Sequence, residues 1–288
     1  MLRIGSLFSG IGGIELGLSR VKKQDGNPAF EVAWQVELEP YCQRVLEKHW
    51  PDVRRWDDIK TFPPGPIDEW SVDMVTGGFP CPTVSYAGSR KGSQDDRWLW
   101  PEMRRVLQLC KPRFCLVENV GGLLSAADVR GVRGGLLGGI LRDLAQIGYG
   151  AGDGWLEYHC VPAEACGARH KRDRIWIIGK LADAIGERGR GRDDQRQDAV
   201  HADARRQVVG TPVDCGGWSV ECRLGRADHG LPEGLDECRG WECGVPRVAT
   251  GQRDRIARLK ALGNAVVPQV VQFIGEQIVV REEARAEG

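Results

Sequence analysis

The chain has 288 residues, and 40 basic side chains balance 40 acidic ones, so its formal net charge is zero. This balance argues against indiscriminate nucleic-acid binding, although a local basic cleft stays open. No apolar run is long enough to cross a membrane, and the chain starts almost directly in a strand, without a signal peptide. We therefore expect a cytoplasmic protein with one large domain and a smaller one.

Strands and helices alternate from the N-terminus. Apolar runs predict strands at residues 2–8, 30–36, 72–76 and 114–117, and amphipathic spacing predicts helices at 13–19, 40–49, 101–110 and 136–147. This alternation is typical of an α/β fold, with a mostly parallel sheet and helices on both faces. Two further runs, 155–161 and 175–178, are expected to form an antiparallel hairpin at one edge of the sheet.

The composition changes after Lys180. Residues 182–244 are rich in Arg, Asp and Gly and show no periodicity, which indicates a small irregular domain or a large insertion. Apolar spacing returns at Arg255, and Pro268 suits the first turn of a terminal helix that packs back on the large domain. The predicted division is 1–181, 182–250 and 251–288.

The ten cysteines include no C-x-x-C pair and are expected to be reduced thiols. The spacings of four of them match no common zinc motif, so we expect no metal site. These four are Cys215, Cys222, Cys238 and Cys243.

A glycine-rich turn follows the first predicted strand. Gly10, Gly12 and Gly13 allow the backbone to turn tightly and to approach a ligand. The dinucleotide fingerprint needs a third glycine where Glu15 stands, so NAD or FAD fits poorly. A nucleotide-like cofactor without a pyrophosphate fits better, and a plain strand–helix turn remains the alternative.

Two carboxylates stand at positions suited to such a cofactor. Glu37 follows the second strand, where it is placed to accept both hydroxyls of a ribose. Asp58 comes after the next turn, where it is placed to accept an adenine amino group. Each of them taken singly also suits a helix cap or a solvated acid.

The reactive groups are expected at the ends of two neighbouring strands. Cys81 lies between two prolines just after the strand at 72–76, and Glu118 directly follows the strand at 114–117. Ligands bind outside the carboxyl ends of parallel strands, so both side chains should reach one crevice. A thiol and a carboxylate there suggest covalent catalysis with acid–base assistance.

A basic cluster spans residues 169–174. Alternate positions of a strand share a face, so His170, Arg172 and Arg174 are predicted to point together into the crevice. Three such donors suit a phosphate, or a carbonyl that gains charge during reaction. A solvated turn is the alternative.

Taken in order, these motifs resemble those of the DNA (cytosine-5)-methyltransferase family. The matching segments are 8–13, 37, 58–59, 80–81, 95–100, 118–120, 170–174 and 263–268. The chain departs from the family at Pro82 and His170, because the family usually has Gln at both positions. Neither departure removes a reacting group.

The resemblance implies a Rossmann-like S-adenosylmethionine-dependent methyltransferase fold, in which residues 182–250 form a small target-recognition region. It implies methyl transfer from S-adenosylmethionine to C5 of a flipped-out cytosine in a specific duplex DNA sequence. Cys81 would attack C6, and Glu118 would hold the N3 and N4 edge. Arg172 would bind the base carbonyl O2, and Arg174 would support the Cys81 loop.

The resemblance also implies a set of cofactor contacts and partners. Phe8 would stack near adenine, Glu37 would hold the ribose, and Asn264 would help to close the site. The full expected set is Phe8, Ser9, Gly10, Gly12, Gly13, Glu37, Asp58, Ile59, Pro80, Leu99, Asn264 and Val266. The expected partners are double-stranded DNA and, in a restriction-modification setting, a cognate endonuclease. A monomer is expected, in the cytoplasm of a prokaryotic or phage-infected cell and without membrane contact.

Three rival functions stay open. One is an RNA or tRNA cytosine methyltransferase of the same fold, although the Cys-Phe-Thr tripeptide of tRNA-type relatives does not occur here. Another is a non-catalytic DNA-binding relative, against which the intact Cys81 and Glu118 argue. The third is a nicotinamide-dependent oxidoreductase, which the glycine spacing disfavours.

Overall fold

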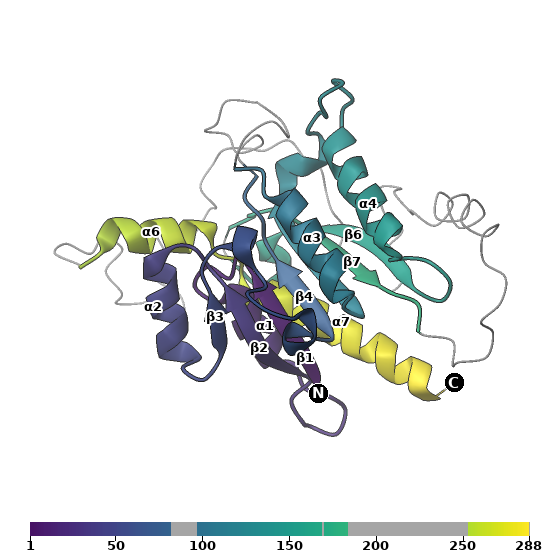
Figure 1. The fold of residues 1–288 in the computed structure, drawn as a ribbon, viewed down its shortest axis with the longest axis horizontal. Helices are drawn as coiled ribbons and strands as arrows, with labels where there is room; N and C mark the ends of the chain where they lie inside the picture. Colours follow the sequence, from purple (N-terminus) through teal and green to yellow (C-terminus); the bar gives the residue numbers. More distant parts are fainter. Residues whose placement is uncertain (82–96, 169, 184–252, 288) are drawn as a thin grey trace.

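The computed structural model describes residues 1–81, 97–168, 170–183 and 253–287 (Figure 1). Within these residues, seven strands form one sheet in the order β3-β2-β1-β4-β5-β7-β6. The strands are β1 (Leu2–Leu7), β2 (Phe30–Val36), β3 (Arg54–Trp56), β4 (Met74–Gly77), β5 (Phe114–Val120), β6 (Trp155–Val161) and β7 (Arg174–Lys180).

The sheet is mostly parallel, as the sequence predicts. The strands from β3 to β5 in this order are parallel to their neighbours. Strand β7 pairs antiparallel with both β5 and β6, so the predicted hairpin forms at the edge of the sheet. The carboxyl ends of β1, β2, β4 and β5 therefore meet along one border of the sheet.

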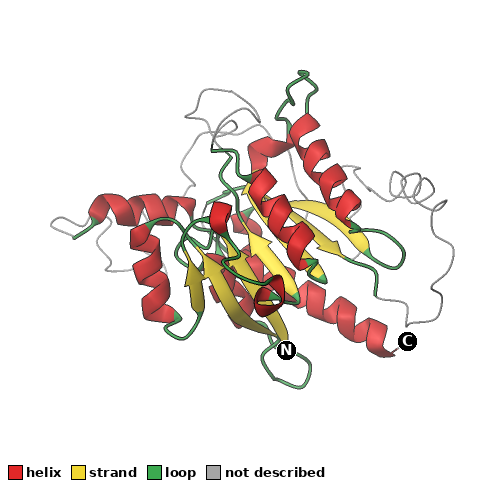
Figure 2. Cartoon of the chain, viewed as in Figure 1, coloured by secondary structure: helices red, strands yellow, loops and turns green. Residues whose placement is uncertain are grey.

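Helices cover both faces of the sheet (Figure 2). Side chains of α3 and α4 pack into one core cluster, and those of α1 and α7 pack into the other. The helices are α1 (Gly13–Ser19), α2 (Pro40–His49), α3 (Trp100–Cys110), α4 (Gly135–Ile147), α6 (Arg255–Asn264) and α7 (Pro268–Glu287). Helix α7 begins at Pro268, the predicted residue, and packs against α1 on the sheet.

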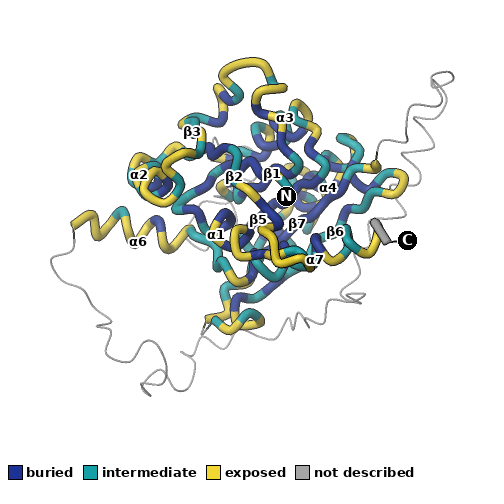
Figure 3. Tube along the Cα trace, turned by 90° about the horizontal axis from the view of Figure 1, so that it is seen from below, coloured by how far each residue is buried: buried dark blue, intermediate teal, exposed yellow. Residues whose placement is uncertain are grey.

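Strand β5 shows how the two cores form. Phe114 and Leu116 point toward the α1 and α7 side, whereas Cys115 and Val117 point toward α3 and α4. All four side chains are fully buried, which is why the strand is a continuous apolar run rather than an alternating one. Figure 3 shows the central strands as the buried interior, with α6 exposed at the periphery.

Four elements differ clearly from the prediction. Strand β5 does not end at residue 117 but continues to Val120, so Glu118 lies within the strand, where it pairs with β7. Strand β3 has only three residues, two of them arginines, so no apolar pattern marks it. The apolar spacing from Arg255 was expected to belong to one segment packed on the large domain, but it divides into α6 and α7, and Leu259 and Leu262 of α6 are exposed. Strand β4 starts at Met74 and includes Gly77, which we expected in a turn. A Cβ at Gly77 would lie 2.8 Å from the Leu7 carbonyl oxygen, so only glycine lets the strands approach there.

None of the helices in the described ranges combines the length and the apolar character that a membrane span requires.

Candidate active site

The turn between β1 and α1 is shaped by positive φ angles. Phe8, Gly10 and Gly12 have φ of 55°, 56° and 83°. A Cβ at Gly12 would lie 2.4 Å from the Trp50 ring, whereas a Cβ at Gly10 would meet nothing within 4 Å. The turn is thus packed against Trp50 at Gly12 and open at Gly10, so a ligand can approach the backbone at Gly10.

Glu37 holds this turn against the end of β2. Its two carboxylate oxygens accept hydrogen bonds from the backbone N–H groups of Gly10 and Glu39, each at 2.7 Å. Burial raises the pKa of the carboxyl, and these two hydrogen bonds oppose the shift. Each oxygen keeps further acceptor capacity, which suits the two hydroxyls of a ribose.

Asp58 acts as a helix cap, which the sequence offered as the alternative to a cofactor contact. Its Oδ1 accepts the backbone N–H of Lys60 at 2.9 Å and so caps the short 3-10 helix Ile59–Thr61. The Ile59 side chain is buried in the core. Asp58 is half-buried, and its second carboxylate oxygen is the one left to meet a ligand.

The segment that carries Cys81 runs along the end of β5. A Cβ at Gly78 would lie 2.6 Å from Oε2 of Glu118, and Asn119 Nδ2 donates to the Phe79 carbonyl at 3.2 Å. Cys81 is half-buried against the core on the α3 and α4 side. The structure therefore brings the Cys81 segment and Glu118 together, because β4 and β5 are paired neighbours.

Glu118 is almost fully buried and bears the strongest electrostatic perturbation of the site. Its Oε1 lies 3.0 Å from Nε of Arg174. Burial raises the pKa of Glu118 from 4.5 to about 7, and the positive charges of Arg174 and Arg172 oppose the rise. A carboxyl with a pKa near neutrality can hold or release a proton at physiological pH.

Arg172 and Arg174 do not alternate on one strand as predicted. Strand β7 begins only at Arg174, and Arg172 precedes it with a φ of 40°, so the two are not alternate residues of one strand. Its Nη2 donates to the carbonyls of Gly263 and Ala265, each at 2.6 Å. His170 is exposed.

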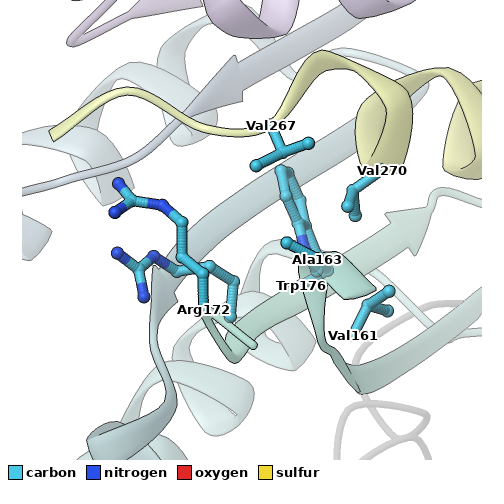
Figure 4. Close-up of a pocket in the computed structure, with 7 residues that line it drawn as sticks. Val161, Ala163, Arg172, Trp176, Val267 and Val270 are labelled. Carbon is cyan, nitrogen blue, oxygen red and sulfur yellow. The ribbon is translucent and has the colours of Figure 1, made fainter. Parts of the chain in front are cut away.

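Both arginines line a small cavity next to α7. The apolar side of this cavity consists of Val161, Ala163, Trp176, Val267 and Val270 (Figure 4). The guanidinium of Arg172 extends away from that apolar side.

Of the remaining residues expected to contact the cofactor, some pack against the protein and others are exposed. Val266 lies against the glycine turn, because a Cβ at Gly13 would be 2.8 Å from its Cγ2. Leu99 is half-buried against the α3 and α4 core, and Ser9 Oγ donates to the Ser6 carbonyl. Asn264 and Pro80 are exposed.

Two residues contribute to the site without having been assigned a role from the sequence. Gly78 permits the close approach of the Glu118 carboxylate, and Asn119 ties the β5 end to the Phe79 backbone. The Gly77–Gly78 pair in the sequence was a signal for Gly78. Only the pairing of β4 with β5 shows that Gly78 makes room for the Glu118 carboxylate.

Several predicted features lie outside the described residues. They are Pro82, Asp95, Asp96, the four cysteines from 215 to 243 and almost all of the segment 182–250. Within the described ranges, no three His, Cys, Asp or Glu side chains are grouped so that they could hold a metal ion.

The family model for C-5 cytosine-specific DNA methylases matches residues 2–206 of this chain. The type II methyltransferase M.NgoBV of Neisseria gonorrhoeae is 32% identical over 178 residues, which cover 61% of this chain and 40% of that protein. M.NlaIV of Neisseria lactamica is 31% identical with the same coverage. The chain thus spans about 40% of the length of these relatives.

A solved structure gives a likeness in fold alone. The methyltransferase EhMeth of Entamoeba histolytica superposes with a TM-score of 0.50 at 15% identity, over 66% of this chain and 56% of that one. The mostly parallel seven-stranded sheet with helices on both faces is the Rossmann-like fold of such methyltransferases. Because the family model covers well over half of the sequence, the chain belongs to the C-5 cytosine-specific DNA methylase family.

Proposed function

We propose that the protein transfers a methyl group from S-adenosylmethionine to C5 of a cytosine in duplex DNA. The observation that carries this proposal is the buried Glu118 carboxyl, which is paired with Arg174 and lies against the segment of Cys81. Its pKa of about 7 suits a group that must hold a proton on the N3 edge of a base near neutral pH. Membership of the family supports the substrate and reaction class.

Each reacting group has a task that follows from its position. The Cys81 thiolate adds to C6 of the cytosine, which shifts electron density to C5. Glu118 gives its carboxyl proton to N3 as the thiolate adds, and it accepts a hydrogen bond from the exocyclic N4. Once C5 has taken the methyl group, C5 loses its proton to solvent, the Cys81 thiolate is expelled and N3 returns its proton to Glu118, which restores both the aromatic ring and the enzyme.

The contacts of the two arginines suggest a division of labour different from the one that the resemblance implies. Arg174 is paired with Glu118, which supports its guanidinium as the group that binds the base carbonyl O2 beside the N3 edge. Arg172 donates to two backbone carbonyls of the turn between α6 and α7 instead. We therefore assign the base contact to Arg174.

The residues around the glycine turn fit S-adenosylmethionine. Gly10 faces open space, Glu37 keeps acceptor capacity for a ribose, and Val266 closes against Gly13. Phe8, Asp58, Ile59 and Leu99 would complete the adenosine side. The cofactor, when bound, supplies an electrophilic methyl group at the end of a sulfonium, without a pyrophosphate for the turn to hold.

The DNA target must leave the helix, because C5 and C6 of a stacked cytosine are out of reach of a side chain. We propose residues 182–250 as the region that reads the sequence, with its arginines contacting guanine edges and phosphates. We also propose that the enzyme is a monomer and that it works alongside a cognate restriction endonuclease.

Two measurements test the proposed function. Bisulfite sequencing of DNA from cells that express the protein should show cytosines protected at one sequence. Duplex DNA with 5-fluorocytosine in that sequence should then form a covalent adduct with the protein. Methylation of tRNA but not of duplex DNA would instead support the RNA methyltransferase.

A further inference from the structure

Arg172 adopts a conformation that L-amino acids rarely take. Its φ of 40° lies in the left-handed region, just before β7 begins at Arg174. Strain of this kind persists only where surrounding contacts hold it, and it clusters at functional sites. The contacts that hold Arg172 are therefore informative.

These contacts lie more than ninety positions further along the chain. Nη2 of Arg172 donates to the carbonyls of Gly263 and Ala265, which lie at the carboxyl end of α6. The last carbonyls of a helix have no partner within the helix and carry partial negative charge. A guanidinium satisfies both needs with charge-assisted hydrogen bonds.

The turn that Arg172 holds is packed on the glycine turn. Val266 follows Ala265 directly, and a Cβ at Gly13 would lie 2.8 Å from Val266 Cγ2 and 3.1 Å from its carbonyl oxygen. A displacement of the α6–α7 turn would open this contact. Arg172 is thus linked to the expected cofactor site: it holds the carbonyls of Gly263 and Ala265, and the next residue, Val266, packs on the glycine turn.

A second attachment of α6 is much weaker. Lys260 pairs with Glu39 at 2.8 Å, but both side chains are substantially exposed. Exposed ion pairs contribute little, because water and salt screen them. Lys260 nevertheless joins the same helix to the segment next to Glu37, so it provides a matched control.

We propose that Arg172 is a positioning residue for the methyl donor: it fastens the α6–α7 turn so that Val266 closes the cofactor site against Gly13. The inference rests on the proposed function, because it assumes that S-adenosylmethionine binds at the glycine turn. It assigns to Arg172, which the resemblance implies as a base contact, an effect on cofactor binding that is present without DNA.

The test is calorimetric titration of S-adenosylhomocysteine into the protein without DNA. Loss of two charge-assisted hydrogen bonds in Arg172→Ala should weaken binding by about tenfold or more. Arg172→Lys, which keeps the charge but not the forked geometry, should fall between the alanine variant and the unaltered protein. Lys260→Ala should bind within about twofold of the unaltered protein.

Arg174→Ala separates this role from a role in the base pocket. It should lose methyl transfer yet bind S-adenosylhomocysteine like the unaltered protein. In steady-state assays, Arg172→Lys should raise KM for S-adenosylmethionine more than it lowers kcat, as expected for a residue that acts through cofactor binding.

Each result has a defined meaning. Equal affinity of Arg172→Ala and the unaltered protein overturns the inference and leaves the proposed function intact. Failure of the unaltered protein to bind S-adenosylhomocysteine overturns both. If Arg172→Ala does not fold, hydrogen exchange in Arg172→Lys decides: faster exchange at Ala265 and Val266 than in the unaltered protein supports the inference, and unchanged exchange contradicts it.

Discussion

Arg174 is the diagonal cross-strand neighbour of Glu118, and its Nε lies 3.0 Å from the Glu118 carboxylate. Val120 pairs with Arg174 and Glu118 pairs with Trp176, so both charged side chains stand on one face of the β5–β7 ladder. Burial disfavours the Glu118 charge and Arg174 favours it. The pKa of about 7 is the balance of these two effects.

The activity should depend on pH through Glu118. Glu118 should give the rate of methyl transfer at subsaturating DNA a falling limb above a pH of about 7, because the free enzyme loses the protonated carboxyl, whereas formation of the Cys81 thiolate favours the reaction as the pH rises. Glu118→Gln should slow the chemical step by about 10²- to 10⁴-fold and remove this dependence. Single-turnover rates from pH 5.5 to 8.5 measure both effects, and a near-normal rate in the variant would contradict the acid role.

Glu118 should also make the folded state less stable at higher pH. Its folded-state pKa is raised above the ordinary 4.5, so its contribution is full below pH 4.5 and is lost as the pH rises to about 7. The loss is at most about 1.4 kcal/mol per pH unit in that window. Urea unfolding at pH 5 and pH 7.5 should therefore show a smaller decline for Glu118→Gln than for the unaltered protein.

Replacement of the proposed nucleophile should separate binding from chemistry. Cys81→Ser should abolish transfer of a tritiated methyl group, because a hydroxyl is a far weaker nucleophile than a thiolate. It should still bind S-adenosylhomocysteine in a calorimetric titration. Cys110→Ser, at the end of α3, is the control and should keep its activity. Turnover by Cys81→Ser would refute the assignment.

Gly78→Ala should impair the site without removing any reacting group. The new Cβ would lie 2.6 Å from Glu118 Oε2, so the carboxylate must shift away from its place beside Arg174. We expect kcat to drop by about 10- to 100-fold, since small displacements of a catalytic group are costly. Gly138→Ala makes the same change in α4, where nothing lies within 4 Å, and should leave kcat unaltered.

Gly13→Ala should act on the cofactor rather than on the base. Its Cβ would collide with Val266, including the backbone carbonyl, and would push the α6–α7 turn away. We expect weaker binding of S-adenosylhomocysteine, while the Glu118 titration stays unchanged. If calorimetry showed normal affinity, the contact between Val266 and the glycine turn would not matter for binding.

Much of the fold could be predicted from local patterns. Helices at 13–19 and 40–49 and the strand at 30–36 match α1, α2 and β2 residue for residue, because their apolar periods are clear. Strand β3 was missed because charged residues fill it, and it is held by its pairing with β2. Helix α6 was not separated from the terminal helix, because its apolar residues lead directly into the apolar spacing of α7.

The sequence alone determined the chemistry available at the site. Residue type and order indicate a thiol and a carboxylate near the carboxyl ends of neighbouring strands and glycines after the first, since the hydrophobic pattern marks where each strand lies. Only the tertiary structure decided which arginine serves which partner. That choice depends on a backbone angle at Arg172 and on a turn 91 positions further along the chain, and no local pattern encodes either.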